Sequence, residues 1–443
     1  MQLTTLGHAA AFVRLSSGST LLVDPWLEDP AYFNSWWHFP PLRKKINDLG
    51  RIDAIYLSHD HPDHCDPKTL QKIPRETELL IPEFTSGSLD RIVNALGFHH
   101  IRRVPFREPF VWNGATIEFF RTDLPWDDSS IMITDGGVTL FNMNDCKLFD
   151  ATLDDLGHKY KIDIALLPYS GAIQFPTCYE LPPAQKLALC EKRRADHLKL
   201  FVDRARRLRT RHAIPFAAGY CLPSPEQWWM NDINNINAPA LAKAALDAAP
   251  PAAWNGASTI CIEMNPGDVW DSKSGLQRDA PAPDWSRHFE IVKDYAKSIA
   301  AEVASRREQE PIPAAGLADR FLVSFRKLVL EQRNLAAQAN YRVVFDVRGA
   351  HGFVAHVDTT KNPAAVGLDE IDGWNLKIRI PSSMLDAVLD GRVTWDEILI
   401  SFRMWFEERP PVYHEPWWAL LHSSNRLDPK RYVADSAIGS VSV

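Results

Sequence analysis

The sequence predicts an α/β fold in which a large metal-binding domain precedes a smaller α+β module. Three observations support this. An apolar, β-branched run ends directly in a loop rich in histidine and aspartate; further short strand patterns alternate with helices; and the last hundred residues change to paired strands followed by helices. We expect a catalytic domain over residues 1–284, a helical connection over 285–340 and the C-terminal module over 341–443.

The stretch with the most chemical information follows the strand predicted over residues 52–57. It reads Ser-His-Asp-His-Pro-Asp-His and places His59, His61, Asp63 and His64 within six residues. His59 and His61 can face one metal ion, and Asp63 and His64 can face a second. Imidazole suits zinc and iron alike, and the added carboxylate favours iron, manganese or zinc. The alternative is a polar loop with ordinary hydrogen bonds, but such a cluster is costly to hold together without a cation.

Composition excludes several classes of protein. A net charge of −7 over 443 residues does not favour nucleic-acid binding. Six scattered cysteines without a Cys-x-x-Cys pair fit a reducing compartment and no disulfide framework. The first residues lack a signal-peptide pattern, and no apolar run approaches the roughly 20 residues of a membrane span. We therefore expect a cytoplasmic protein without membrane contact; the sequence leaves its oligomeric state open.

The first fifty residues predict two strands and an aromatic loop. The strands cover 12–15 and 20–23, and the second ends at Asp24. His8 precedes the first strand, where it either faces the metal cleft or packs in the core. The loop 30–48 contains many aromatic residues and either roofs the cleft or serves as packing.

The rest of the chain predicts further elements in order. A long helix over 184–211 carries many arginines, which form either a solvated face or, as the minority interpretation, a membrane or partner surface. The stretch 238–283 is rich in Ala, Pro and Asn and predicts irregular structure. The tail predicts helices over 285–309 and 315–339, strands over 341–347, 353–358 and 376–380, and helices over 381–390 and 395–408.

The His-x-His-x-Asp-His spacing resembles that of the metallo-β-lactamase superfamily, which implies an αββα sandwich. Within that superfamily the chain resembles the CMP-N-acetylneuraminate hydroxylases and their bacterial relatives. The tail resembles sterol-carrier-type modules in the order of its elements. The stretches that carry the hydroxylase resemblance are Asp24–Leu27, Trp36-Trp37, the histidine loop, Asn144–Cys146, Tyr169–Ala172, Pro215–Tyr220, Trp395–Glu397 and Arg409–His414.

This resemblance implies a set of metal-binding, catalytic residues: His59, His61, Asp63, His64 and Asp145. In this fold the loop 121–128 usually brings a third histidine, but here it offers only Asp123, Asp127 and Asp128. Ala217 stands where many metal-hydrolase relatives carry a final histidine, and His8 is a further candidate ligand. Four aromatic residues on loops next to ligand positions are candidates for the substrate cleft: Trp36, Trp37, Trp126 and Tyr169.

The resemblance also implies an oxygenase that uses iron, with two iron ions as the favoured centre and zinc or manganese as the alternatives. Carboxylate-rich, under-filled coordination suits iron that binds dioxygen, and we expect a small organic substrate. The sialic-acid hydroxylases carry an N-terminal Rieske domain, whose cluster needs Cys-x-His and Cys-x-x-His pairs. This sequence begins at the lactamase-like domain and holds no such pair, so we expect electrons from a separate electron-transfer protein or from the substrate, and no sialic-acid specificity.

Two other functions remain open at this point. A metal-dependent hydrolase would use a metal-bound hydroxide against an ester, lactone, amide or phosphodiester. A non-enzymatic scaffold would bind a ligand or partner through the C-terminal module, although the intact histidine loop argues against it.

Overall fold

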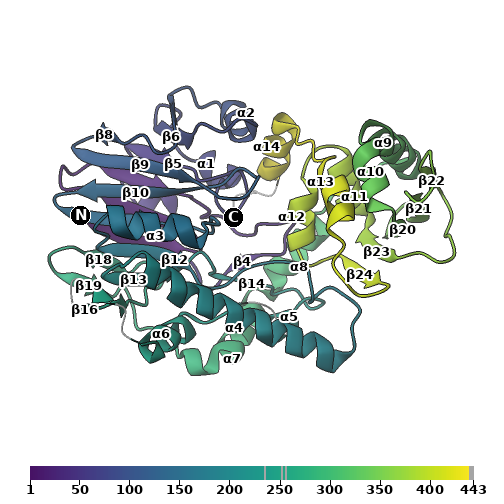
Figure 1. Ribbon diagram of the computed structural model, residues 1–443. Helices are drawn as coiled ribbons and strands as arrows, with labels where there is room; N and C mark the ends of the chain where they lie inside the picture. Colours follow the sequence, from purple (N-terminus) through teal and green to yellow (C-terminus); the bar gives the residue numbers. More distant parts are fainter. Residues whose placement is uncertain (234–235, 251–252, 255–256, 439–443) are drawn as a thin grey trace.

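Two sheets packed face to face form the larger part of the protein, and a third sheet with its own helices lies at one end (Figure 1). The computed structural model describes residues 1–443 except 234–235, 251–252, 255–256 and 439–443. Within these residues the first sheet runs, in spatial order, β19 (Gly275–Gln277), β18 (Val269–Asp271), β1 (Gln2–Gly7), β2 (Ala10–Arg14), β3 (Thr20–Val23), β5 (Ala54–Tyr56), β6 (Glu78–Pro82) and β7 (Ile101–Val104). The second runs β17 (Ile260–Cys261), β13 (His212–Phe216), β12 (Ile164–Pro168), β11 (Val138–Asn142), β10 (Ser129–Asp135), β9 (Ala115–Arg121) and β8 (Phe110–Trp112).

Apolar side chains fill the space between the two sheets and cover their outer faces. Leu3 and Tyr56 of the first sheet are buried against Phe119 and Ile131 of the second. The outer face of the first sheet packs against α1 (Pro67–Leu70) and α2 (Ser88–Ala95). The outer face of the second packs against α3 (Asp150–Lys159), α4 (Pro183–Arg207) and α6 (Pro239–Ala248). The order helix, sheet, sheet, helix confirms the predicted αββα sandwich.

The long basic helix α4 rests on the second sheet through one face. Cys190, Phe201 and Ala205 are buried there, and Arg207 forms ion pairs with Asp150 and Asp154 of α3, both at 2.7 Å. Among the described residues, no helix is both long enough and apolar enough to cross a membrane.

The C-terminal part forms a third, five-stranded sheet with helices on it. Its strands, in spatial order, are β22 (Ala365–Gly367), β21 (Phe353–Asp358), β20 (Arg342–Arg348), β23 (Leu376–Pro381) and β24 (Trp405–Glu408). Its helices are α9 (Leu317–Glu331), α10 (Arg333–Ala339), α11 (Ser382–Leu389), α12 (Trp395–Ile400) and α13 (Glu415–His422). The connection from the sandwich consists of a 3-10 turn over Trp285–Arg287, α7 (His288–Ser298) and α8 (Ala300–Glu308).

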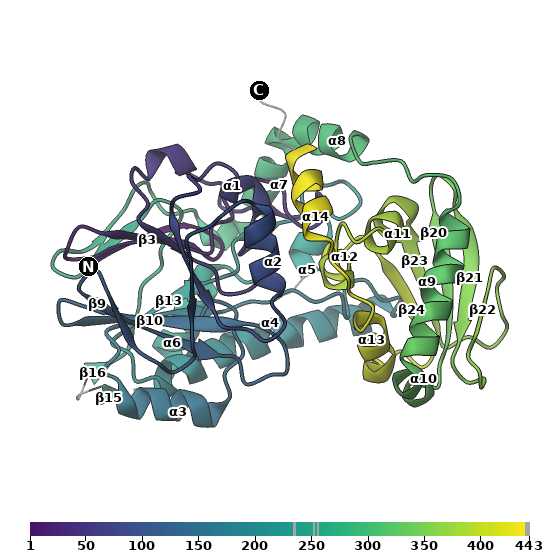
Figure 2. The ribbon, with the colours of Figure 1, turned by 90° about the horizontal axis from the view of Figure 1, so that it is seen from above.

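This module shares a core with the sandwich. Trp36 and Tyr179 of the N-terminal part lie in one buried cluster with Phe345 and Trp418 of the module, and the Trp36 indole donates to the carbonyl of Ile400 (2.9 Å). The last helix, α14 (Pro429–Ile438), lies between α2 and the module's helices in both views (Figures 1 and 2). The sandwich and the C-terminal module are therefore in contact through several separate segments of the chain.

Five expectations about secondary structure were wrong. An additional strand, β1, precedes His8, and the helix expected over 315–339 is divided at Gln332 into α9 and α10. The helix expected over 395–408 ends at Ile400, and β24 follows because residues 405–408 alternate in burial and pair with β23. The described part of the stretch 238–283 is only partly irregular: α6 begins with Pro239 in its first turn, where proline is tolerated, and β18 pairs with β1 in the first sheet. The helix expected over 285–309 is divided at Ile299.

Candidate metal centre

The ends of several strands meet at one edge of the sandwich. β1 is antiparallel to β2, β2 is antiparallel to β3, and β3 is parallel to β5, so β1, β3 and β5 all end on the same side. His8, Asp24 and the histidine loop follow these three strands directly. In the second sheet Asp145 follows β11, and Asp128 precedes the antiparallel β10 at the same edge.

The chain turns sharply at four of these strand ends. His8, Asp24, Asn144 and Ala217 have left-handed φ angles of 45°, 42°, 52° and 55°. Residues other than glycine rarely adopt this conformation, which costs free energy and is found preferentially at functional sites. All four lie at the edge where the candidate ligands meet, so the backbone is bent where the side chains must converge.

Two groups of potential metal ligands meet there and share one residue. His8, Asp63 and His64 form one group, and His59, His64 and Asp145 form the other; within each group the ligand atoms lie within 4.8 Å of one another. His8 Nε2 is 2.9 Å from Asp63 Oδ2. His64 Nε2 is 3.6 Å from Asp63 Oδ2 and 3.5 Å from Asp145 Oδ1. The sharing of His64 places the two groups side by side.

The atoms at the centre of this cluster fit a bound cation. His64 Nε2 and Asp145 Oδ1 are buried and have no hydrogen-bond partner among the described residues, although buried polar atoms are normally paired. Burial lowers the pKa of His64, but Asp63, Asp145 and Asp24 outweigh it and raise that pKa well above its usual range. The negative charges of three carboxylates therefore stabilise a positive charge at this imidazole, and a bound metal ion would provide that charge in place of a proton.

Asp24 fixes the orientation of His64. Its Oδ2 accepts a hydrogen bond from His64 Nδ1 (3.0 Å) and from the Ser58 hydroxyl (2.8 Å), and its Oδ1 accepts from the Ser58 backbone N–H (2.7 Å). A carboxylate on the far nitrogen of a histidine sets its tautomer and directs the other nitrogen toward the metal. Asp24 therefore points His64 Nε2 into the cluster.

Tyr32, from the aromatic loop, holds Asp63. Its hydroxyl donates to Asp63 Oδ1, while His8 contacts Oδ2 of the same carboxylate. Burial raises the pKa of Tyr32 well above its usual value, and the Asp63 charge adds to this effect, so the phenol remains a donor. Both carboxylate oxygens of Asp63 are therefore in contact with a neighbouring side chain.

Of the three aspartates in the loop 121–128, the structure brings one to the cluster. Asp128 is buried, and its Oδ1 lies 3.4 Å from His59 Nδ1. Asp123 is exposed and accepts a hydrogen bond from the Phe149 backbone N–H (2.6 Å), and Asp127 faces Arg121 at 3.5 Å. Asp128 is therefore the candidate to take the place of the absent histidine.

The remaining histidines lie on either side of the centre. His61 is half-buried; its ring centroid is 4.5 Å from that of His59, but neither three-residue group includes it. The Ala217 N–H donates to the carbonyl of His8 (3.1 Å). His8 therefore lies beside the position at which the sequence lacks a histidine.

The four predicted aromatic cleft residues are dispersed. Trp36 stacks on Tyr220 with ring centroids 3.6 Å apart and lies near the ring of His8. Tyr169 is buried and lines a small cavity of about 40 Å³ beside His8. The structure does not bring the other two to the centre: Trp37 packs with Val292 and Val303, and Trp126 is half exposed.

Sequence reasoning missed three residues of the site, Asp24, Ser58 and Tyr32. The position of Asp24 carried a usable signal, because a residue that directly follows a strand parallel to that of the histidine loop lies at the same edge of the sheet. Nothing in the aromatic loop distinguished Tyr32 from its neighbours.

Comparisons with known proteins agree with the fold. Residues 19–201 match the family model described as Beta-lactamase superfamily domain. A Rieske 2Fe-2S iron-sulfur protein of Mycobacterium tuberculosis is 34% identical over 52% of this chain and 46% of its own length, so the chain spans about half of that relative. The cytidine monophosphate-N-acetylneuraminic acid hydroxylase of Danio rerio is 22% identical over 94% of this chain and 71% of its own length.

Solved structures of similar fold include Igni18, a metallo hydrolase of Ignicoccus hospitalis (18% identity, TM-score 0.42, 60% of this chain and 96% of that chain). Another is CmlA, a diiron β-hydroxylase of Streptomyces venezuelae (18% identity, TM-score 0.41, 59% of this chain and 53% of that chain). The chain contains a β-lactamase-fold domain, and its homologues include proteins named as CMP-N-acetylneuraminic acid hydroxylases and Rieske proteins.

Proposed function

We propose that this protein is a metal-dependent oxygenase with two iron ions, which oxidises a small organic substrate with dioxygen. The observation that carries the proposal is the pair of adjacent ligand groups that share His64, each of which holds two histidines and one carboxylate. Similarity to proteins named as hydroxylases over 94% of this chain supports it.

The proposed ligands of one iron are His8, Asp63 and His64. Those of the other are His59 and Asp145, with His61 and Asp128 beside them. Four of these seven residues come from the histidine loop, one from the end of β1 and two from the second sheet, so the ions would be held at the edge where the two sheets meet. Iron in such a site supplies the electrons and open coordination positions that dioxygen needs.

The protein's own residues would orient and shield the reaction. Asp24 keeps His64 turned toward the metal, and Tyr32 keeps Asp63 in place. Trp36, stacked on Tyr220 against the C-terminal core, excludes water from the side of His8. Burial lowers the pKa of His59 well below its usual value, with the charges of His64 and His61 adding to it, so the imidazole is neutral and able to bind a metal.

A metal-dependent hydrolase is the second candidate. Two ligand groups that share one imidazole would also suit two zinc ions, which lower the pKa of a bound water to about 7. In that case Asp128, whose pKa is raised well above its usual value by burial and by the charge of Asp145, would be placed to hold a proton.

The metal content of aerobically purified protein separates the two candidates. We expect about two irons per chain, with Mössbauer spectra of an iron-57 sample showing a coupled diferric pair, and oxygen uptake when electrons are supplied by a separate donor. Two zinc ions and no iron would refute the oxygenase and support the hydrolase. The double variant His59→Ala/His61→Ala should lose metal and activity; unchanged function in that variant would support a scaffold.

A further inference from the structure

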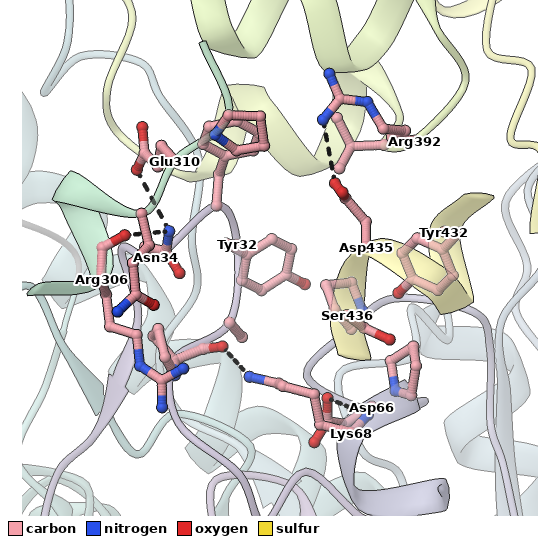
Figure 3. A pocket seen from close by; sticks show the side chains of 18 residues that line it. Tyr32, Asn34, Asp66, Lys68, Arg306, Glu310, Arg392, Tyr432, Asp435 and Ser436 are labelled. Carbon is pink, nitrogen blue, oxygen red and sulfur yellow. Dashed lines mark hydrogen bonds and ion pairs between the residues drawn. The ribbon is translucent and has the colours of Figure 1, made fainter. Parts of the chain in front are cut away.

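A cavity of about 180 Å³ lies directly beside the histidine loop (Figure 3). It is lined by five segments that are distant in sequence: the aromatic loop with Tyr32, the histidine loop with Pro62, the end of α8 with Arg306, the turn before α12 with Arg392, and α14 with Tyr432. Tyr32 lines the cavity and donates to Asp63, so one side chain joins the cavity to the metal centre.

The acidic side chains that line this cavity are already engaged. Asp435 is paired with Arg392 at 3.2 Å. Glu310 is bound at both oxygens by Arg403, at 2.6 and 3.0 Å. Asp66 accepts hydrogen bonds from the backbone of α1, the helix that it precedes. None of the three is left to attract a cation.

Two basic side chains are less compensated. Lys68 donates to the carbonyl of Pro30, and among the described residues no carboxylate lies within ion-pair distance of its ammonium group. Within the part of the chain that the structure describes, the ion-pair partner of Arg306 is Glu302, at 3.6 Å, and that carboxylate is 53% exposed, so the pair is weak. Figure 3 shows Lys68 and Arg306 on the same side of the cavity, below the ring of Tyr32.

The two cations are close enough to disfavour one another. Burial lowers the pKa of Lys68; Asp66 and Asp29 oppose this, and the charge of Arg306 lowers it further. A lysine ammonium has three donors, and Pro30 occupies one of them, so donors remain for a ligand. An anion between Lys68 and Arg306 would relieve their repulsion and satisfy these donors.

We propose that this cavity binds a small organic anion, a carboxylate or a phosphate monoester, with its acidic group on Lys68 and Arg306 and its apolar part against Tyr32 and Tyr432. A cavity of roughly 150 Å³ holds benzene, so the occupant has on the order of ten heavy atoms. In naming this anion as the substrate, or one end of it, the inference rests on the proposed function; the binding itself does not.

Titration calorimetry with phenyl phosphate and benzoate tests the proposal, with benzyl alcohol as the neutral analogue. We expect both anions to bind and benzyl alcohol to bind at least about tenfold more weakly, because a hydrogen bond to a charged group contributes about 1.5–3 kcal/mol. The relative affinities of phenyl phosphate and benzoate distinguish the two acidic groups. Lys68→Met and Arg306→Met should each weaken anion binding about tenfold or more.

Two further variants serve as controls for this test. Lys68→Arg preserves the charge and should retain most of the affinity, which would assign the Lys68→Met loss to the charge; matching circular dichroism spectra of Lys68→Met and the wild type would exclude misfolding. Lys72→Met removes a lysine four residues further on, which is paired with Glu28 at 2.5 Å and does not line the cavity, and should bind the anions as the wild type does. Equal affinity for benzyl alcohol, or wild-type affinity in both Met variants, would overturn the proposal.

Metal-stripped protein separates this inference from the proposed function. The cavity lies outside both ligand groups, so anion binding should change less than about threefold when the metal is removed. If zinc replaces iron and the oxygenase fails, binding should persist. If binding disappears with the metal, the anion binds the metal and the cavity proposal fails.

Discussion

The substitution Asp24→Asn tests whether Asp24 orients His64, because it leaves His64 itself unchanged. Asparagine has nearly the same volume and can still accept the Ser58 backbone N–H through its carbonyl oxygen. At the position of Oδ2 it presents an amide NH₂ to His64 Nδ1, which lies at 3.0 Å and then has no acceptor. The imidazole must rotate, which turns Nε2 away from the cluster, or change tautomer, which puts the proton on Nε2 and removes the lone pair that would bind a metal.

The expected effect is a 10- to 100-fold loss of metal affinity, which is the usual cost of removing such a supporting carboxylate and corresponds to about 1.4–2.8 kcal/mol. The assay is competition for metal with a chromophoric chelator, with metal stoichiometry measured after dialysis. Asp53→Asn is the matched control, because Asp53 accepts from the Thr20 backbone N–H (3.0 Å) at the opposite end of the same pair of strands. If Asp24→Asn binds metal as tightly as Asp53→Asn, the role assigned to Asp24 is wrong.

Three further changes have definite expected outcomes. Tyr32→Phe removes one of the two grips on Asp63 and should weaken metal binding by about tenfold or less, since His8 keeps the other; the same chelator competition measures it, and a complete loss of metal would contradict the role. Burial raises the pKa of Glu397 to about 8. Its contribution to the free energy of unfolding is therefore complete below the pKa it has in the unfolded chain and is lost as pH rises through 8, by up to about 5 kcal/mol. Urea unfolding of metal-free protein at pH 6 and pH 9 should show a smaller decline in the free energy of unfolding for Glu397→Gln than for the wild type. Arg403→Met leaves Glu310 without its two-point partner and should lower the free energy of unfolding by about 2–3 kcal/mol, whereas an unchanged urea midpoint would show that this ion pair adds nothing.

The sandwich and the position of the histidine loop could be predicted because their patterns are local. An apolar run that ends in a histidine-rich loop indicates a strand and the end at which the loop lies. Parallel strands bring their carboxyl ends to one edge of a sheet, independently of the conformation of the loops. That rule places His59, Asp63 and His64 at one edge, whereas Asp145 was expected only from the family resemblance; the structure brings these four candidate ligands together.

The residues that support these ligands could not be predicted in the same way, because their roles depend on contacts between distant segments. Tyr32 lies 31 residues before Asp63, in a loop where several aromatic side chains share one composition. Similarly, only packing distinguishes Asp128 from Asp123 and Asp127, since one is buried and the other two are turned to other partners. The break at Ile400 was missed because the strand after it, Trp405–Glu408, is only four residues long and too short for a clear periodicity, so its pairing with β23 decides its structure.

The C-terminal module takes part in the site through the aromatic loop. The Trp36 indole donates to the carbonyl of Ile400, and Arg403 donates to the carbonyl of Phe33 at 3.1 Å while it binds Glu310. Phe33 is the neighbour of Tyr32, which holds Asp63. The position of Asp63, a candidate metal ligand, thus depends on a loop that contacts with residues of the C-terminal module hold in place. Through these contacts the C-terminal module helps to position the loop that holds Asp63. Trp36 also belongs to one buried cluster, which extends from the aromatic loop into the third sheet.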